Sequence, residues 1–294
     1  MDKVSLSDKK YIAIFVLPTL LLYLIFVFYP VVYNMYISMF KTDLMSINVF
    51  VGFKNYALLF QDQFFLTALK NNGLMICGSF LAHMLLGLFF ANALFHKIKG
   101  SEVFQSVFFS PVVISGAAVG IMFSFVYNSE FGLVNKILEL LSLSHLKMPW
   151  LSSEKTVMPA LIFVVMWRFV GYHMIIQLAA MKGIPVNLYE ASELDGASQW
   201  QQFTMVTFPL IKHILKIDLI LIITGSLRYY DLVAVMTKGG PNHASEVMST
   251  YMFYQAFRTL KFGYSSTIGM IIFVLSFLVI GSVSKLFKTE SIEY

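Results

Sequence analysis

The sequence predicts an all-α integral membrane protein with six transmembrane helices, and three observations lead to this prediction. Hydrophobic residues make up 58% of the 294 residues and charged residues only 13%, about half the charged share of a soluble domain. Six stretches are apolar over about 20 residues, the length at which a helix crosses the hydrocarbon core of a bilayer. The runs LIFVVMW and MIIFVLSFLVIG do not alternate as strands of a membrane barrel do. Helices are therefore expected, because they satisfy their own backbone polar groups in lipid.

Short polar segments separate the six stretches, and none is long enough to form a soluble domain. Residues 1–294 are therefore expected to form a single transmembrane domain. The first apolar stretch is expected to be retained, because it is too long for a signal peptide and has no AxA-like cleavage site. The approximate spans are Tyr11–Met35, Leu74–Phe95, Val103–Tyr127, Val157–Met181, Ile214–Met236 and Tyr264–Phe287.

Charge and cysteine content limit the remaining possibilities. The net charge of +5 is spread along the chain, so no nucleic-acid partner is expected. The single cysteine, Cys77, allows no disulfide within the chain. Ten Lys and Arg residues fall on the side of the N-terminus and nine on the other side, where the loops are longer. The positive-inside rule favours cytoplasmic termini by this narrow margin.

The segment 182–213 carries three carboxylates between the fourth and fifth apolar stretches. Pro185 suits a first helical position, where its missing N–H costs nothing, and Val186–Leu194 can form a short helix. Gly196 can adopt the left-handed conformation that ends one helix and permits another. A second short helix is expected over Ala197–Phe203, with Pro209 marking the turn into the fifth span. On physical grounds alone, an ordinary amphipathic loop is an equal alternative.

The residues of this segment closely resemble the EAA loop of ABC-importer permeases, in particular the carbohydrate group similar to maltose permeases. Ser192 stands where the motif usually has its second alanine. FVGFKNYALLF, YNSEFGLVNKIL and TKGGPNHASEVMSTYMFYQAF look like outer segments of the same group, whereas the large outer domain of some maltose-type permeases is absent. The loop residues that carry the resemblance are Ile184, Pro185, Leu188, Tyr189, Glu190, Ala191, Asp195, Gly196, Ala197, Trp200, Phe203, Thr207, Pro209 and Leu210.

The resemblance implies the transmembrane domain of a type I ABC importer, in a bacterial or archaeal cytoplasmic membrane. Its expected partners are a second, non-identical permease, two ATPase subunits and an extracytoplasmic solute-binding protein. The chain has no GxxxxGKS or GxxxxGKT loop, so no cofactor is expected in it, and ATP and Mg would be bound by the ATPases. The binding protein is expected to dock on outer loops that include Gly239, Gly240 and Pro241. The residues expected to couple to the ATPase are Tyr189, Glu190, Ala191, Ser192, Asp195, Gly196, Ala197 and Trp200.

Polar side chains within the apolar stretches are candidates for the path of the solute. Sugars present hydroxyls and apolar C–H faces, which suit aromatic rings with a few charged hydrogen-bonding groups. An alternative is that Arg228 and Asp231, three residues apart, only neutralise each other. The candidates are Trp167, Arg168, Tyr172, His173 and Gln177 in the fourth span and Arg228, Tyr229, Tyr230 and Asp231 in the fifth.

Other polar and small residues are interpreted structurally. Ser115, Gly116 and Gly120 are expected to allow close helix packing. His83 is expected to be a packed, hydrogen-bonded side chain, and no HExxH or other metal spacing occurs.

An ABC permease that imports a carbohydrate, with an oligosaccharide expected, is the favoured function. An ion-coupled secondary transporter that uses Arg168, Asp218 or Asp231 as coupling charges is the alternative, although no inverted repeat is visible. An intramembrane enzyme lacks any nucleophile and base spacing. Maltodextrins, galactosides, raffinose-like sugars, uronic oligosaccharides and glycerol phosphate all remain open as solutes.

Overall fold

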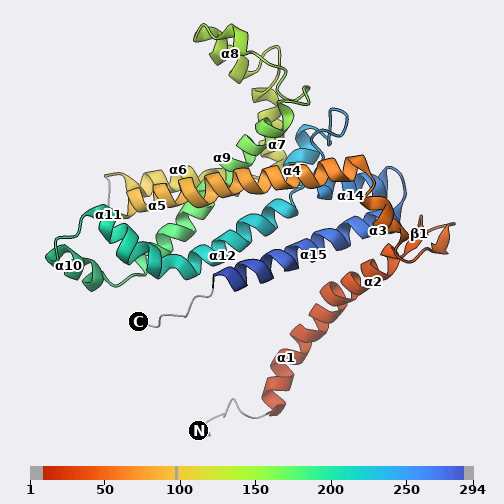
Figure 1. Cartoon of the computed structure of the whole chain (residues 1–294), viewed down its shortest axis with the longest axis horizontal. Helices are drawn as coiled ribbons and strands as arrows, with labels where there is room; N and C mark the ends of the chain where they lie inside the picture. The colour runs from red at the N-terminus through yellow and green to blue at the C-terminus, as the bar shows by residue number, and fades with distance from the viewer. Residues whose placement is uncertain (1–8, 97–98, 288–294) are drawn as a thin grey trace. The chain divides into compact units, whose positions relative to one another are not determined.

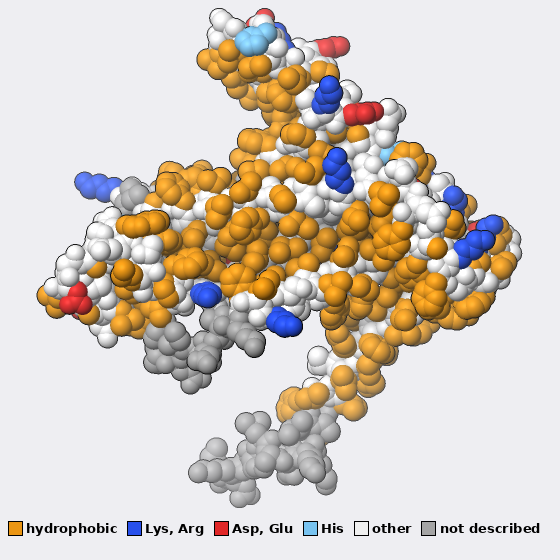
Figure 2. Space-filling view, viewed as in Figure 1, with side chains coloured by type: hydrophobic (Ala, Val, Ile, Leu, Met, Phe, Trp, Pro, Cys, Tyr) orange, Lys and Arg blue, Asp and Glu red, His pale blue; other side chains and the backbone are white. Residues whose placement is uncertain are grey.

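The computed structural model describes residues 9–96 and 99–287, and it consists of two compact units (Figure 1). Of the described residues, 9–61 and 252–271 form the first unit, and 62–96, 99–251 and 272–287 form the second. Both termini of the chain lie outside the described residues. Each unit is built of apolar helices, and hydrophobic side chains cover most of the face seen in Figure 2.

The first unit begins with one long apolar helix. It consists of α1 (Lys9–Tyr23), a π-helical turn η1 (Leu24–Phe28) and α2 (Tyr29–Ser38). A two-stranded antiparallel hairpin follows, β1 (Phe40–Thr42) and β2 (Asn48–Phe50), in which Phe40 pairs with Phe50. The short helix α3 (Lys54–Leu59) comes next. Asn55 fastens it to the chain before it, because its Nδ2 donates to the carbonyl oxygens of Ser38 and Phe40 at 2.8 and 2.9 Å.

The second unit is a bundle around the long helix α9 (Val157–Lys182). Its first helix runs unbroken from Gln63 to Phe95, as α4 (Gln63–Ser79), the π-helical segment η2 (Phe80–Leu86) and α5 (Gly87–Phe95). The other elements, in chain order, are α6 (Ser101–Val113), α7 (Gly116–Val126), α8 (Leu133–Leu140), η3 (Ser144–Leu146), α10 (Val186–Leu194), α11 (Gln199–Gln202), η4 (Phe203–Thr207), α12 (Phe208–Leu227) and α13 (Asp231–Met236). Helices α14 (Met248–Phe257) and α15 (Phe262–Leu286) complete the chain.

The predicted third span, Val103–Tyr127, is wrong as a single helix. Helices α6 and α7 meet at an angle of 98°. Ile114 is extended, and Ser115 caps α7 by accepting a hydrogen bond from the N–H of Ala118 at 3.3 Å. Side-chain oxygens of this kind compensate the unbonded N–H groups at the start of a helix, which stabilises the break.

The predicted fifth span, Ile214–Met236, also differs from the structure. Helix α12 begins at Phe208 and ends at Leu227, and α13 begins only at Asp231. Helix α12 contains Lys212, Lys216 and Asp218 within its length. Among the described residues, length and composition alone identify four helices able to cross a membrane, or five if the bent pair of α6 and α7 counts as one.

The second helix is also longer than expected, since it starts at Gln63 rather than near Leu74. Asp62 caps it by accepting hydrogen bonds from the N–H groups of Phe64 and Phe65. The fourth and sixth expected spans agree with α9 and α15 to within two residues at each end.

Two clusters of buried side chains form the interior of the second unit. One lies among α7, α9 and α13 and includes Val119, Leu161 and Leu232. The other lies among η2, α5, α9 and α12 and includes Met174 and Ile211. The short helices α10 and α11 follow the end of α9 that is nearer the second cluster.

Candidate functional site

In the EAA-like segment the short helix predicted over Val186–Leu194 is confirmed as α10, whereas the second short helix predicted over Ala197–Phe203 is the beginning of a longer helix that runs from Gln199 to Leu227. Helix α10 covers Val186–Leu194, and Gly196 has a φ of +80°, a conformation that glycine adopts without steric cost. Ser198 then starts α11 with a reciprocal capping box, in which its Oγ accepts from the N–H of Gln201 while the Gln201 side chain accepts from the N–H of Ser198.

Two prolines of this segment lie differently from the prediction. Pro185 is the N-cap of α10 rather than its first helical residue. Pro209 marks no turn, because α11, η4 and α12 run on from Gln199 to Leu227 without interruption. The π-helical turn η4 ends at Thr207, and Pro209 is the second residue of α12, where a proline lacks no intrahelical hydrogen bond that the first turn would make.

Side-chain hydrogen bonds join α10 to the helix that begins with α11 and continues through η4. The Tyr189 hydroxyl lies 2.9 Å from the Thr207 hydroxyl, and Gln202 Nε2 donates to Ser192 Oγ at 3.1 Å. Ser192, in the position where the motif usually has alanine, thus joins α10 to α11. The ring of Trp200 stacks on that of Phe203 with centroids 5.8 Å apart.

The outer surface of this helix pair is both apolar and acidic. Leu194 is 91% exposed and Trp200 is 70% exposed. Glu190, Ala191 and Asp195 are exposed as well. Exposed large apolar side chains beside carboxylates are typical of a surface that contacts another protein.

Within the bundle, an ion pair joins the fourth and fifth predicted spans. Arg168 of α9 is buried, and its Nη1 lies 3.0 Å from Oδ2 of Asp231, the first residue of α13. Arg168 Nη2 also donates to the carbonyl oxygen of Ile114 at 3.1 Å. The arginine therefore bonds the backbone at the α6–α7 break and the carboxylate at the start of α13 at once.

Gly116 makes this arrangement possible. A Cβ on Gly116 would lie 1.5 Å from Asp231 Oδ2 and 2.6 Å from Arg168 Nη1. A side chain at this position would displace the ion pair. Gly120 likewise packs against Val235, so the prediction of close packing at both glycines is confirmed. Ser115 instead caps α7.

The alternative in which Arg228 and Asp231 neutralise each other is wrong. Helix α12 ends at Leu227, just before Arg228, and Asp231 begins α13 and pairs with Arg168. Arg228 is exposed and its Nε donates to the Thr224 carbonyl at 3.4 Å. Sequence spacing suggested the pair because the two residues would lie on one face of a continuous helix, which the structure does not have here.

The substrate-path candidates divide into three groups. Arg168, Tyr229 and Asp231 lie together beside the α6–α7 break. In the part of the chain that the structure describes, Arg168 Nε and the buried Tyr229 hydroxyl have no hydrogen-bond partner. Tyr172 and Tyr230 are exposed, and Trp167 packs in the first core cluster, where its ring contacts Phe123 with centroids 5.2 Å apart.

His173 and Gln177 belong to a separate buried network that centres on Asp218 of α12. His173 Nδ1 lies 2.6 Å from Asp218 Oδ1, and Gln177 Nε2 donates to Asp218 Oδ2 at 2.7 Å. Gln177 Nε2 also donates to the His83 carbonyl oxygen at 3.1 Å. Asp218 is fully buried, so this network ties α9, α12 and η2 together inside the bundle.

The role of Asp218 in packing was missed from the sequence, which marked it only as a coupling charge of the alternative transporter. Its signal was a carboxylate in an apolar helix together with two polar residues at i,i+4 spacing, His173 and Gln177, in the preceding span. His83 is packed, as expected, and its ring stacks on His173 with centroids 4.8 Å apart. Its Nε2, however, has no partner among the described residues.

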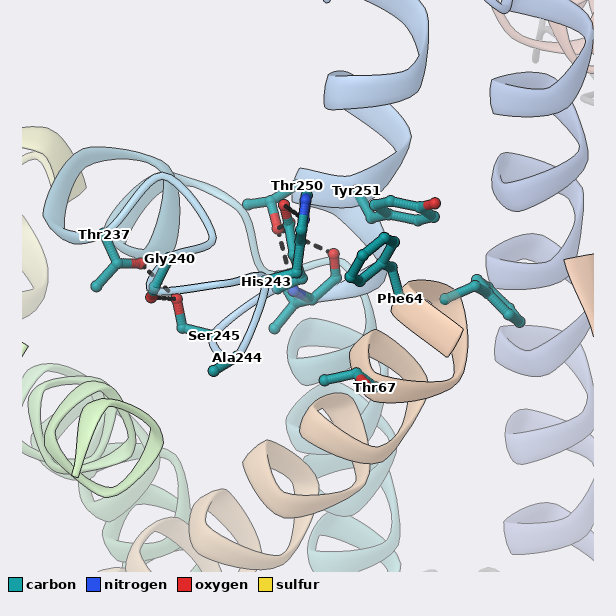
Figure 3. A network of polar contacts seen from close by, with 12 residues as sticks. Phe64, Thr67, Thr237, Gly240, His243, Ala244, Ser245, Thr250 and Tyr251 are labelled. Atoms are coloured by element: carbon teal, nitrogen blue, oxygen red, sulfur yellow. Dashed lines mark hydrogen bonds and ion pairs between the residues drawn. The ribbon is translucent and has the colours of Figure 1, made fainter. Parts of the chain in front are cut away.

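The outer segment with Gly239, Gly240 and Pro241 forms a tight loop before α14 (Figure 3). The Ser245 hydroxyl lies 2.8 Å from that of Thr237 and also donates to the Gly240 carbonyl oxygen. Asn71 of α4 stabilises the loop, because its Nδ2 donates to the carbonyl oxygens of Ala244 and Glu246 at 2.8 Å each. The loop is thus held in one conformation by side chains on both of its flanks.

One acidic side chain is buried in this loop. The carboxylate of Glu246 accepts a hydrogen bond from the Thr250 hydroxyl and lies 3.2 Å from His243 Nδ1. Burial raises the pKa of the Glu246 carboxyl above its usual range, against the opposite effects of Thr250 and His243. In Figure 3 the His243 ring lies beside that of Phe64, and their centroids are 4.2 Å apart.

A bundle of long apolar helices with buried polar groups at helix breaks is the structure of an integral membrane protein. No three His, Cys, Asp or Glu side chains of the described residues are placed to hold a metal ion. The chain belongs to the family of binding-protein-dependent transport system inner membrane components, whose model matches residues 83–289. It is thus an ABC-transporter permease subunit.

Three similar proteins illustrate this membership. The chain is 36% identical over 286 residues to the probable ABC transporter permease protein YurN of Bacillus subtilis. The aligned residues cover 96% of this chain and 98% of YurN. It is 29% identical to the multiple sugar-binding transport system permease protein MsmF of Streptococcus mutans, over 92% of each. The fold matches a chain of a bacterial alginate ABC transporter, crystallised with an alginate pentasaccharide-bound periplasmic protein, with a TM-score of 0.83, 22% identity and coverage of 95% and 94%.

Proposed function

We propose that this permease carries a carbohydrate, with an oligosaccharide as the expected solute, across a bacterial or archaeal cytoplasmic membrane. The observation that carries the proposal is the group of Arg168, Asp231 and Tyr229. It offers a guanidinium, a carboxylate that is 44% exposed and a phenol within one region of the bundle. Sugar hydroxyls both donate and accept hydrogen bonds, so they match such a mixed set. The similarity to a permease named for multiple sugars supports the same class of solute.

In this proposal Asp231 is the residue that meets the solute. Its carboxylate uses Oδ2 for Arg168 and Oδ1 for the N–H of Leu232 at 3.0 Å, and each oxygen has a further lone pair for a hydroxyl donor. Tyr229 and Arg168 Nε supply additional polar atoms that lack partners in the described structure. Trp167, Tyr172, His173, Gln177, Arg228 and Tyr230 have no such role in this proposal.

The energy for transport comes, in this proposal, from two ATPase subunits that bind ATP and Mg on the cytoplasmic side. Their groove receives α10 and α11, which is the helix-in-groove mode of recognition. Exposed Leu194 and Trp200 supply the apolar contact, and Glu190 pairs with a cation of the ATPase. Because α11 continues into α12 without a break, a movement of the docked helices is passed directly to a membrane helix as a rigid body.

The assembly has a second, non-identical permease subunit that completes the path. The termini of this chain and residues 182–213 face the cytoplasm, and the solute-loaded binding protein contacts the opposite side. The loop with Gly239, Gly240 and Pro241 suits such a contact, because its side-chain hydrogen bonds fix its shape before a partner arrives.

Reconstitution tests this function. Proteoliposomes that contain the chain with its second permease and ATPases should take up a labelled oligosaccharide only when ATP is inside and the loaded binding protein is outside. A panel of neutral oligosaccharides, uronic oligosaccharides and glycerol phosphate would identify the solute. Uptake driven by an ion gradient without ATP contradicts the mechanism, and uptake of glycerol phosphate without any sugar contradicts the solute class.

A further inference from the structure

The connection between α7 and α9 contains an amphipathic helix with an exposed apolar face. In α8 and the residue after it, Leu133, Ile137, Leu140 and Leu141 are all exposed, and Leu140 is 84% exposed. Their spacing of four, three and one residues places them on one side of a helix. Such a stripe in a protein that was fully surrounded by water would be an unfavourable surface.

The opposite side of α8 is fastened to the chain's own return segment. Asn135 is buried, and its Oδ1 accepts a hydrogen bond from Trp150 Nε1 at 2.8 Å. Its Nδ2 donates to the carbonyl oxygens of Ser129 and Met148 at 3.2 Å each. At about 100° per residue, Asn135 points away from the side that carries Leu133, Ile137 and Leu140. The return segment therefore covers one side of the helix, and the apolar stripe faces away from it.

The helices before and after this connection determine on which side of the bilayer it lies. Helix α7 ends at Val126 and α9 begins at Val157, so the segment starts and ends at the same surface of the bilayer. This surface is the one opposite the coupling helices, which follow the other end of α9. The Thr156 hydroxyl donates to the Trp150 carbonyl at 2.9 Å, and the rings of Tyr127 and Trp150 have centroids 6.1 Å apart. Tyr and Trp favour the boundary between lipid and water.

The charged residues of the connection lie away from the apolar stripe. Glu139 lies 2.9 Å from the Lys147 ammonium and 3.6 Å from that of Lys136. Figure 2 shows hydrophobic side chains on the lower and left sides of the uppermost extension, which holds α8, and charged ones toward its top and right.

We propose that α8 is an interfacial anchor, whose Leu133, Ile137, Leu140 and Leu141 insert among the acyl chains of the leaflet opposite the coupling helices. A helix with one apolar side and charges beside it lies in the plane of such an interface. The occupant is lipid because both ends of the connection lead into spans of the same bilayer, and the bonds of Asn135 to Met148 and Trp150 hold α8 against the segment that leads into α9. The anchor holds the ends of α7 and α9, and with them the α6–α7 break, at a fixed depth.

Site-directed spin labelling of the assembled transporter in bilayers tests the proposal. In a Cys77→Ala background, nitroxides are attached at Leu140→Cys and Ile137→Cys, with Lys136→Cys and Glu139→Cys as matched controls on the charged side. Collision with oxygen, which partitions into lipid, is compared with collision with a water-soluble nickel complex. The labels at 137 and 140 should collide more with oxygen, and those at 136 and 139 more with nickel.

Three other results would overturn the proposal. Equal nickel collision at 140 and 139 would place the stripe in water. Low collision with both reagents at 137 and 140 would mean that a protein subunit covers it. Loss of oxygen collision at 140 when solute-loaded binding protein is added would identify the stripe as a docking site for that protein. Because all four positions are exposed in the chain, the labels themselves should leave the fold intact.

Discussion

Replacement of Asp218 by alanine should weaken the packing of α9 against α12 much more than replacement by asparagine. In the native chain His173 Nδ1 lies 2.6 Å from one oxygen of the Asp218 carboxyl group, and Gln177 Nε2 donates to the other oxygen at 2.7 Å. Alanine removes both acceptors from a site where Asp218 and Gln177 are fully buried. Asparagine keeps one acceptor oxygen, and its amide can donate to a neutral His173 ring of the other tautomer.

The geometry sets the size of the difference. Each buried N–H group that loses its acceptor lowers the free energy of unfolding by about 1–3 kcal/mol. Loss of the acceptors of His173 and Gln177 in Asp218→Ala therefore lowers it by about 2–6 kcal/mol. Hydrogen bonds between membrane helices average about 0.6 kcal/mol, so the lower limit for the loss of two bonds is about 1 kcal/mol. Because both donors are held inside the bundle away from water, we expect the upper range for alanine. For Asp218→Asn, which can keep both contacts, we expect about 1 kcal/mol or less.

The measurement is the temperature at which the purified complex loses its monodisperse state, together with uptake in proteoliposomes. Glu139→Ala serves as a matched control, since it removes a carboxylate that is half exposed and outside the spans. The expected order of stability is wild type, close to Asp218→Asn and Glu139→Ala, and well above Asp218→Ala. Equal stability of the alanine and asparagine variants would refute the reasoning. Loss of transport in a stable Asp218→Asn complex would instead favour a coupling charge.

Three further predictions concern the other parts of the site. Glu190→Lys or Gly196→Pro should abolish ATPase co-purification and uptake while membrane insertion persists, because each damages the docking helices; wild-type uptake in both variants would contradict the docking. Asp231→Asn should lower uptake in an assembled complex, whereas Arg168→Leu should also disturb assembly, seen by size-exclusion chromatography; unchanged uptake in Asp231→Asn would remove its solute role. The raised pKa of Glu246 means that the folded loop favours the neutral acid, so the loop should be most stable below the usual value near 4.5 and lose stability as pH rises through the raised pKa. Hydrogen exchange of amides 237–247 should show this pH dependence, and Glu246→Gln should flatten it.

Helix α10 and the turn at Gly196 could be predicted from the sequence because the residue types that favour them lie within the same short segment. Gly196 is needed where the chain takes a positive φ, and the polar run from Val186 to Leu194 is short and bounded by Pro185. Such features depend on a few neighbouring residues. The length of α9 was also predictable, since a long apolar run has no other stable conformation in lipid.

The breaks at Ile114 and after Leu227 could not be predicted, because their stabilising contacts come from a distant part of the chain. Arg168 supplies the donor that the Ile114 carbonyl lacks, from 54 residues away. Apolar composition alone favours a continuous helix across both places. The position of Asp231 beside Arg168 depends on these two breaks together. The spacing in the sequence favours a pair of Asp231 with Arg228, but that pair requires a continuous helix that the structure does not have.

If Asp231 meets the solute as proposed, the two contacts of Arg168, with Asp231 and with the Ile114 carbonyl oxygen, limit where new solute preferences can arise. Arg168 donates to the Ile114 carbonyl oxygen at the break between α6 and α7. Replacing Arg168 would therefore alter the packing at this break as well as the chemistry of the proposed solute path. Among the described residues, the Asp231 carboxylate bonds the N–H of Leu232 and the guanidinium of Arg168, and another acceptor such as asparagine or glutamate could take its place. Laboratory evolution of this permease toward other sugars should therefore accumulate changes at Asp231 while Arg168 stays unaltered.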